Sequence, residues 1–283
     1  MILILFLPIL LLRNTVTAAC SRTVLRWTAD SYIFAQRTGN PEDWANIADN
    51  VQYLENNNTA NFLTGFLSRP QRITHSRSIY DTTACALWTE LVIANSSHPR
   101  VIATQMWLDA DRQVAKIDSL ISEQGDWLFN ASAYQHYASA ENWNTLPASK
   151  RSTRTVLKAA ADAYCDYFMN RNITIPYSPD CIRIEGGEIV PCVGRVSPHL
   201  LNNRRYVIDE TLGAISVFLG FGGLDRGRPD WDVPDSHTFR LEAGQIRYIH
   251  TVSICSVPGC GVRNVTRPTD HDYRKMRALT RPV

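Results

Sequence analysis

The sequence lacks an apolar run long enough to cross a membrane as a helix. The run Ile2–Leu12 has 11 residues, interrupted only by Pro8, whereas a membrane-spanning helix needs about 20. Arg13 and a stretch of small residues follow it, which is typical of a signal peptide and its cleavage site. We therefore predict a signal peptide over residues 1–19, cleaved near residue 18 or 19, no stable membrane anchor, and export to the secretory pathway or beyond.

The sequence also lacks a strong excess of charge of either sign. Its 29 Lys and Arg residues against 27 Asp and Glu residues give a formal charge of +2, which offers no electrostatic case for a nucleic-acid partner. With 45% apolar and 20% charged residues among 283, the composition excludes disordered, collagen-like and coiled-coil proteins. A folded globular protein with a sizeable core is expected, and its oligomeric state is left open.

Several common catalytic motifs are missing. The chain has no Gly-x-Ser-x-Gly, Walker, His-Glu-x-x-His or kinase signature. The segment Gly220–Gly223 follows an expected strand, but Leu224–Pro229 comes next in place of a helix, so a loop is favoured over a dinucleotide site. His237 and His250 could form a metal pair, but without a third ligand we favour hydrogen-bonded sheet residues. No cofactor and no metal are expected.

Cys-x-x-Cys pairs and zinc-type spacings are absent, although the chain has seven cysteines. An odd number allows at most three disulfides within a monomer and leaves one thiol free. The short-range pairs Cys181/Cys192 and Cys255/Cys260 are the natural candidates, but spacing alone does not determine the connectivity. In an oxidising compartment such cysteines usually staple loops.

N-glycosylation sequons are more numerous than expected by chance. In each, Ser or Thr follows two residues after the asparagine with no Pro between, which makes the asparagine an acceptor if the chain enters the secretory route. The five candidates are Asn57, Asn95, Asn130, Asn172 and Asn264. Each predicts a surface position.

An internal repeat organises the rest of the chain. Ala29–Tyr32 recurs as Ala161–Tyr164, and the pattern of residues 113–118 recurs in residues 245–250, both at an offset of 132 residues. Arg77–Asp81 matches Arg205–Asp209 at an offset of 128. The repeat predicts an N-terminal half over residues 20–150 and a C-terminal half over residues 151–283.

Each half shows the same order of periodic patterns. Helical spacing of apolar residues predicts helices near residues 24–36 and 156–168. Runs rich in β-branched and aromatic residues predict strands at 86–93, 101–107, 214–219, 238–242 and 245–252, the last two joined by a tight turn at Ala243-Gly244. The fold class expected is α+β, with a helix packed on a curved antiparallel sheet in each half.

The order of motifs resembles a family of secreted fungal proteins with SnoaL-like, or NTF2-like, features. The motifs that carry the resemblance are spread over the chain: Ala29–Tyr32, Tyr53–Asn56, Gly125–Phe129, Cys181–Gly187, Arg204–Glu210, Asp235–Arg240 and Ile246–Thr251. The resemblance implies two SnoaL-like halves. It also implies kinship with hetero-Diels–Alderases of tropolone sesquiterpenoid biosynthesis, which dehydrate a hydroxymethyl tropolone to an o-quinone methide and add it to a humulene-type alkene.

The candidate catalytic residues come from strand alternation and from the repeat. Tyr248 and His250 should share one face of the last strand, where they could supply a proton donor and an orienting hydrogen bond; a buried, hydrogen-bonded core histidine is the alternative. Asp81 and Asp209 occupy equivalent repeat positions, and Arg205 precedes Asp209 by four residues as Arg77 precedes Asp81. Burial would raise the pKa of either carboxyl, whereas an ion pair with the preceding arginine is the structural alternative.

Aromatic residues within the expected strands could line a pocket for a planar ligand, although such residues are more often simply core. They are Trp88, Trp107, Phe218 and Phe239. The expected function is therefore a cofactor-independent hetero-Diels–Alderase with tropolone and sesquiterpene substrates. A non-catalytic carrier of apolar ligands or an effector is the alternative, and a simple dehydratase or cyclase is the third possibility.

Overall fold

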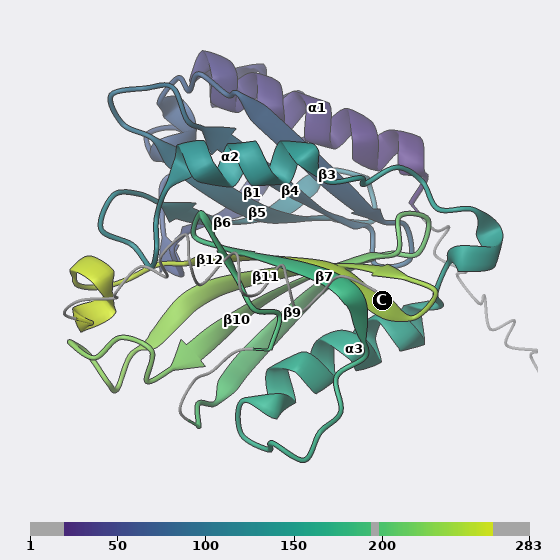
Figure 1. The fold of residues 1–283 in the computed structure, drawn as a ribbon. Coiled ribbons are helices and arrows are strands. Elements are labelled where there is room, and N and C mark those ends of the chain that lie inside the picture. The colour runs from purple at the N-terminus through teal and green to yellow at the C-terminus, as the bar shows by residue number, and fades with distance from the viewer. Residues whose placement is uncertain (1–19, 194–197, 263–283) are drawn as a thin grey trace, which may run out of the picture.

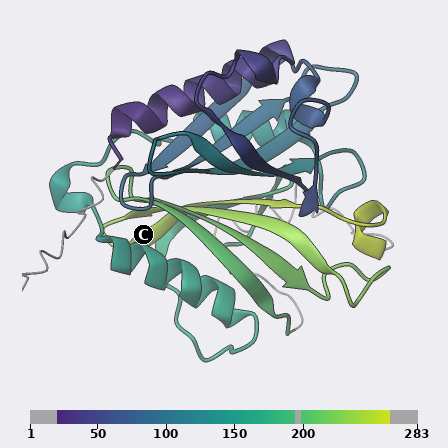
Figure 2. The same cartoon turned by 180° about the vertical axis from the view of Figure 1, so that it is seen from behind.

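Two sheets lie face to face, and one long helix covers the outer face of each. The computed structural model describes residues 20–193 and 198–262 (Figure 1). Helix α1 (Arg22–Thr38) covers the first sheet and α3 (Arg154–Tyr167) covers the second, as both views show (Figure 2). The shorter α2 (Ala131–Ala140) contacts strands of both sheets.

The two sheets have equivalent strand orders. The first runs β2-β1-β6-β5-β4-β3 and the second β8-β7-β12-β11-β10-β9. The strands of the first sheet are β1 (Ile47–Glu55), β2 (Asn58–Thr59), β3 (His75–Asp81), β4 (Ala86–Ile93), β5 (Arg100–Leu108) and β6 (Val114–Ser122). Those of the second are β7 (Tyr177–Glu185), β8 (Glu188–Val190), β9 (Leu201–Asp209), β10 (Ala214–Gly222), β11 (Asp232–Glu242) and β12 (Gln245–Ser253).

Both sheets are mixed, so the prediction of antiparallel sheets is wrong in this respect. β1 pairs with β6 in parallel, as β7 does with β12, while the other pairings are antiparallel. A hairpin would force neighbouring strands to be antiparallel, but β1 is separated from β6 in the chain by strands β2 to β5. The α+β class is confirmed.

The two helices begin and bury side chains in the same way. The side chains of Ser21 and Thr153 accept the backbone N–H three residues later and so cap α1 and α3. Gly39, with φ of 69°, ends α1. The buried faces follow helical spacing and match at the offset of 132: Leu25, Ala29 and Tyr32 in α1, and Leu157, Ala161 and Tyr164 in α3.

Three apolar clusters fill the interior. One lies between α1 and the first sheet, one between α3 and the second sheet, and the third between the sheets. We call the region between α3 and the second sheet the C-terminal cone. The strands β4 and β10 are buried along nearly their whole length because both of their faces are covered.

The last hairpin forms as predicted but with an irregularity. Ala243 and Gly244 have φ of 50° and 81°, as a tight two-residue turn requires. The register shifts between Ile246 and Tyr248, so Ile246 faces the C-terminal cone while Tyr248 and His250 face the first sheet. Simple alternation along the strand would place Ile246, Tyr248 and His250 on one face, and the shift moves Ile246 to the other.

Three disulfides cross-link the described residues. Cys181–Cys192 and Cys255–Cys260 are the predicted short-range pairs, and Cys20–Cys85 is the third. Cys165 is a buried free thiol, and burial raises its pKa to about 12. Three disulfides are typical of an oxidising, secreted environment. No helix within residues 20–193 and 198–262 is long and apolar enough to cross a membrane; the predicted signal peptide and Asn264 lie outside the described residues.

Candidate functional site

Asp209 joins the two sheets. Its carboxylate accepts two hydrogen bonds from the Arg22 guanidinium, at 2.8 and 2.9 Å, and one from the backbone N–H of Tyr80 at 2.9 Å. Asp209 thus binds the first turn of α1 and strand β3, neither of which belongs to its own sheet. This arrangement stabilises the contact between the sheets.

Asp81 makes the reciprocal contacts. It accepts from Arg154 at 2.7 Å and from the backbone N–H of Ile208 at 2.9 Å. Arg22 and Arg154 are themselves 132 residues apart. The expected ion pairs with Arg77 and Arg205 are therefore wrong, because on a strand a residue four positions earlier lies too far along the same face to reach the carboxylate.

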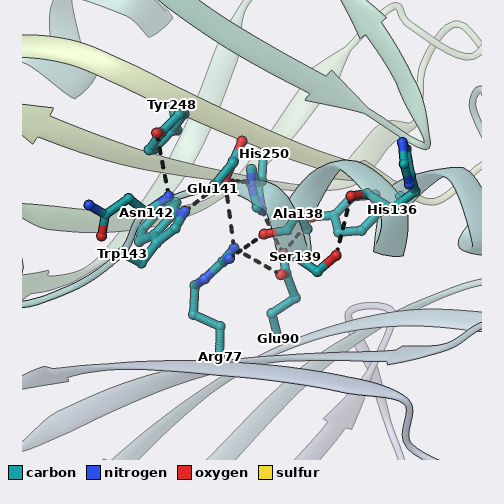
Figure 3. Close-up of polar contacts among 11 residues, drawn as sticks. Arg77, Glu90, His136, Ala138, Ser139, Glu141, Asn142, Trp143, Tyr248 and His250 are labelled. Carbon is teal, nitrogen blue, oxygen red and sulfur yellow. Dashed lines mark hydrogen bonds and ion pairs between the residues drawn. The ribbon is translucent and has the colours of Figure 1, made fainter.

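Arg205 instead pairs with a buried group of the opposite sheet, whereas Arg77 pairs with Glu90 of its own sheet and with Glu141, which follows α2. Arg205 lies 3.1 Å from Asp118 of β6. Arg77 belongs to a group of four charged residues that we call the inter-sheet ion cluster: Arg77, Glu90, Glu141 and His250 (Figure 3).

His250 lies at the centre of the inter-sheet ion cluster. Its Nδ1 is 2.9 Å from Glu90 and its Nε2 is 2.7 Å from Glu141. Glu90 also accepts from the Tyr134 hydroxyl at 2.5 Å and lies 3.4 Å from Arg77. Burial alone would lower the pKa of His250, but the carboxylates of Glu141 and Glu90 raise it to about 9. Conversely, burial alone would raise the pKa of Glu90, but His250, Arg77 and the Tyr134 hydrogen bond together lower it to about 2.

Tyr248 lies beside this cluster and contacts the segment that follows α2. Its ring stacks on Trp143 at 6.0 Å between centroids, and its hydroxyl accepts the backbone N–H of Asn142 at 3.4 Å. The guanidinium carbon of Arg77 lies over the Trp143 ring, 4.4 Å from its centroid. The structure thus brings Tyr248 and His250 together as expected, but the two positive and two negative charges of the inter-sheet ion cluster balance one another.

The stability of the protein should depend on pH through His250. Because its pKa is raised from 6.5 to about 9 in the fold, its contribution is fully present below pH 6.5 and is lost as pH rises through 9. The free energy of unfolding, measured in urea, should fall over this window by on the order of 3 kcal/mol more in the wild type than in His250→Gln. Parallel pH curves for the two proteins would contradict the assignment.

The predicted aromatic lining is divided between two regions. Trp88 and Phe218 are buried between the sheets, and Trp107 packs against that cluster. Phe239 instead faces α3 in the C-terminal cone. These four residues therefore do not surround one common space.

A second polar group, which we call the cone cluster, lies in the C-terminal cone. Its members are all contributed by α3, β7 and β11: Tyr164, Arg183, Glu185, Asp235 and His237. His237 and Asp235 are fully buried. The Nδ1 atom of His237 lies 3.2 Å from Oδ2 of Asp235, and the His237 ring lies 5.2 Å from the ring of Tyr164.

Part of the cone cluster is paired internally. Glu185 lies 3.0 Å from Arg183 and accepts from the indole N–H of Trp127 at 2.9 Å. Oδ1 of Asp235 accepts from the Ser253 hydroxyl at 3.1 Å. These contacts fix the two carboxylates on the face of the sheet that meets α3.

Other atoms of the cone cluster are buried without a hydrogen-bond partner. They are both ring nitrogens of His237, Oδ2 of Asp235, the Tyr164 hydroxyl and Nε of Arg183. Nδ1 of His237 and Oδ2 of Asp235 are 3.2 Å apart but are not aligned for a hydrogen bond. An unpaired buried polar group costs about 1–3 kcal/mol, so several at one place indicate a site that water or a polar ligand completes. A histidine beside a carboxylate and a tyrosine hydroxyl can donate and accept protons.

Sequence reasoning did not single out most of these residues. Glu90, Glu141, Tyr164, Arg183 and Asp235 were not proposed as functional, and His237 was considered only as a metal ligand. The motifs Cys181–Gly187 and Asp235–Arg240 contain much of the cone cluster, which was the available signal. His237 and His250 lie on opposite faces of neighbouring strands, and no metal-ligand group occurs in the described residues.

Comparisons with known proteins add little to this geometry. A family model described as a domain of unknown function (DUF8021) matches residues 150–253, which include the cone cluster. No curated protein matches the chain. One similar solved structure is a protein of Xanthomonas campestris pv. campestris described as "a putative polyketide cyclase"; it is 14% identical over 35% of this chain and 91% of that chain, with a TM-score of 0.25.

Proposed function

We propose that the protein is a cofactor-independent enzyme of the dehydratase or cyclase type, with its reaction centre in the cone cluster. The observation that carries this proposal is the set of unpaired, buried donors and acceptors on Tyr164, Asp235 and His237. They lie among apolar side chains of α3 and the second sheet. Such surroundings suit a small, largely apolar substrate with one or two polar groups.

In the specific form of the proposal, the reaction is that of a hetero-Diels–Alderase with two SnoaL-like halves. His237 protonates the hydroxyl of a hydroxymethyl tropolone, which leaves as water, and the proton of the ring hydroxyl then returns to His237; Asp235 orients the imidazole. The Tyr164 hydroxyl donates a hydrogen bond to the tropolone oxygen; burial raises the pKa of this hydroxyl well above 10, which keeps it protonated. Apolar walls then keep water from the o-quinone methide while it meets the humulene-type alkene.

Because His237 and Asp235 are fully buried, substrate entry requires that the covering side chains move.

The second candidate site for the same reaction is the pair Tyr248 and His250, with Asp81, Asp209 and Arg205 at the contact between the sheets. Its favourable feature is the aromatic stack of Tyr248 on Trp143.

The decisive assay incubates the purified protein with hydroxymethyl tropolone and humulene and resolves the adducts by chiral chromatography. A single enantiomer formed faster than without protein supports the full reaction. With a small thiol in place of humulene, accelerated thiol adduct identifies dehydration alone. A racemic product at the rate without protein in both assays would overturn the enzyme proposal. Saturable quenching of tryptophan fluorescence by the tropolone without turnover would indicate the apolar-ligand carrier.

A further inference from the structure

A cavity of about 280 Å³ opens between the two sheets, away from both polar clusters. One of its lining residues, Arg205, is the repeat counterpart of Arg77, which belongs to the inter-sheet ion cluster. The residues that line it come from both sheets: Leu54, Asn57, Lys116, Asp118, Asn203, Arg205, Gly220 and Asp232. Whatever fills this cavity would therefore contact both halves of the protein.

The cavity is built with polar atoms that lack partners. Oδ1 of Asp118 and Nε of Arg205, both on lining residues, are buried without a hydrogen bond, as is Oδ1 of the neighbouring Asn202. Burial raises the pKa of Asp118. A Cβ at Gly220 would lie 2.6 Å from Oδ1 of Asn202 and 2.9 Å from Cβ of Asp232, so a side chain there would displace residues at the cavity wall. The acceptors on Asp118 and Asn202 lie beside the cations Arg205 and Lys116. An uncharged molecule with several hydroxyl groups could donate to the first pair and accept from the second.

The chain itself carries an attachment point for such an occupant. Asn57 lines the cavity, is exposed, and begins the sequon Asn57-Asn58-Thr59. It lies in the β1–β2 turn with φ of 64°, and its side-chain Oδ1 accepts from Arg205 at 3.4 Å. Asn95, Asn130 and Asn172 are also exposed but do not line this cavity.

We propose that Asn57 is N-glycosylated and that its first sugar is seated in this cavity, where it bridges the two sheets. Its hydroxyls donate to Asp118 and Asn202, and its ring and acetamide oxygens accept from Arg205 and Lys116. The glycan at Asn57 is thus a structural part of the fold, whereas glycans at Asn95, Asn130 and Asn172 project into solvent. This inference does not depend on the proposed catalytic activity.

The modification is the ordinary transfer from a polyprenyl-pyrophosphate-linked oligosaccharide. Nδ2 of Asn57 forms the bond to C1 of the first sugar, the bond from C1 to the pyrophosphate oxygen breaks, and Nδ2 loses one proton. Polyprenyl pyrophosphate leaves with the electron pair. A flexible hairpin before folding would present Asn57, and closure of the sheets would then seat the sugar.

The test compares glycans on the native, secreted protein. Peptide-N-glycosidase should remove the Asn57 glycan about tenfold more slowly than the Asn172 glycan, with release followed by ¹⁸O incorporation and peptide mass spectrometry. Asp118→Ala should speed release at Asn57 alone, and Asp111→Ala, an exposed carboxylate of the β5–β6 turn, should not. Equal release rates in the wild type, or an unmodified Asn57, would overturn the proposal.

A second measurement does not require the glycosidase. Asn57→Gln should lower Tm by about 2–4 °C, whereas Asn172→Gln should leave Tm within about 1 °C of the wild type, as expected for a surface position. If Asn57→Gln is not secreted, Thr59→Ala, which abolishes the same sequon and leaves Asn57 in place, gives the same comparison. Identical Tm values with and without that glycan would contradict a bridging role.

Discussion

Replacing Glu90 by glutamine is expected to lower the free energy of unfolding by about 3–5 kcal/mol, because it leaves buried positive charge without its partner. Glu90 is fully buried and lies within 3.4 Å of both His250 and Arg77. With glutamine at this position, only Glu141 would balance these two cations. Urea unfolding with the disulfides intact measures the loss directly, provided that the transition is two-state.

A matched control separates this effect from the loss of a carboxylate in general. Glu42 is exposed on the short helical turn Pro41–Asp43, and Glu42→Gln should change the free energy of unfolding by no more than about 0.5 kcal/mol. If the free energy of unfolding of Glu90→Gln fell by less than about 1 kcal/mol, the inter-sheet ion cluster would be well solvated, which would contradict the burial of Glu90 and His250.

A double variant tests whether charge balance is the cause. In Glu90→Gln/His250→Gln, Arg77 and Glu141 remain as a neutral pair. The double variant should therefore be destabilised by clearly less than the sum of the two single variants, which is the signature of direct coupling. Additive losses would instead indicate that packing around Glu90 matters more than its charge.

The sequence predicted those parts of the fold that depend on local pattern. The helical spacing of Leu25, Ala29 and Tyr32, and of their counterparts in α3, determined both outer helices. The central strands β4, β5, β10, β11 and β12 were predicted from β-branched and aromatic runs. In each of these cases the signal lies within a few residues, because helix and strand periods are properties of a single segment.

The contacts of the candidate sites could not be predicted in the same way. Glu90 lies in strand β4, which is buried on both faces, so alternation of polar and apolar residues does not reveal its direction. Its partner His250 is 160 residues away, and Asp81 reaches a backbone N–H 127 residues away. Only the packing of one sheet on the other brings these residues together.

The division of the two histidines shows the same limit. His237 and His250 come from paired strands, yet they face opposite sides of the second sheet because Thr238, and not His237, is opposite His250. A shift of one residue in register would have reversed their environments. Both histidines could therefore be identified from the sequence, but the sequence does not predict which of them faces the C-terminal cone.

The sharpest test of the catalytic proposal is His237→Asn, which should reduce kcat/KM for tropolone dehydration by about 10²–10⁴-fold, the usual contribution of a general acid. Asparagine keeps a polar side chain of similar length but carries no titratable proton. His136→Asn, on the exposed side of α2, is the matched control and should retain wild-type activity. Near-UV circular dichroism and Tm establish that each variant is folded.

Comparison with His250→Asn then decides between the two candidate sites. His250 is held by two carboxylates at 2.9 and 2.7 Å, so its replacement should reduce stability while the kcat/KM of the folded fraction changes little. Asp235→Asn should preserve substrate binding but lower kcat and change the pH profile, since Asp235 would act by orienting His237. Loss of activity in His250→Asn with full activity in His237→Asn would move the reaction centre to the contact between the sheets, beside Tyr248.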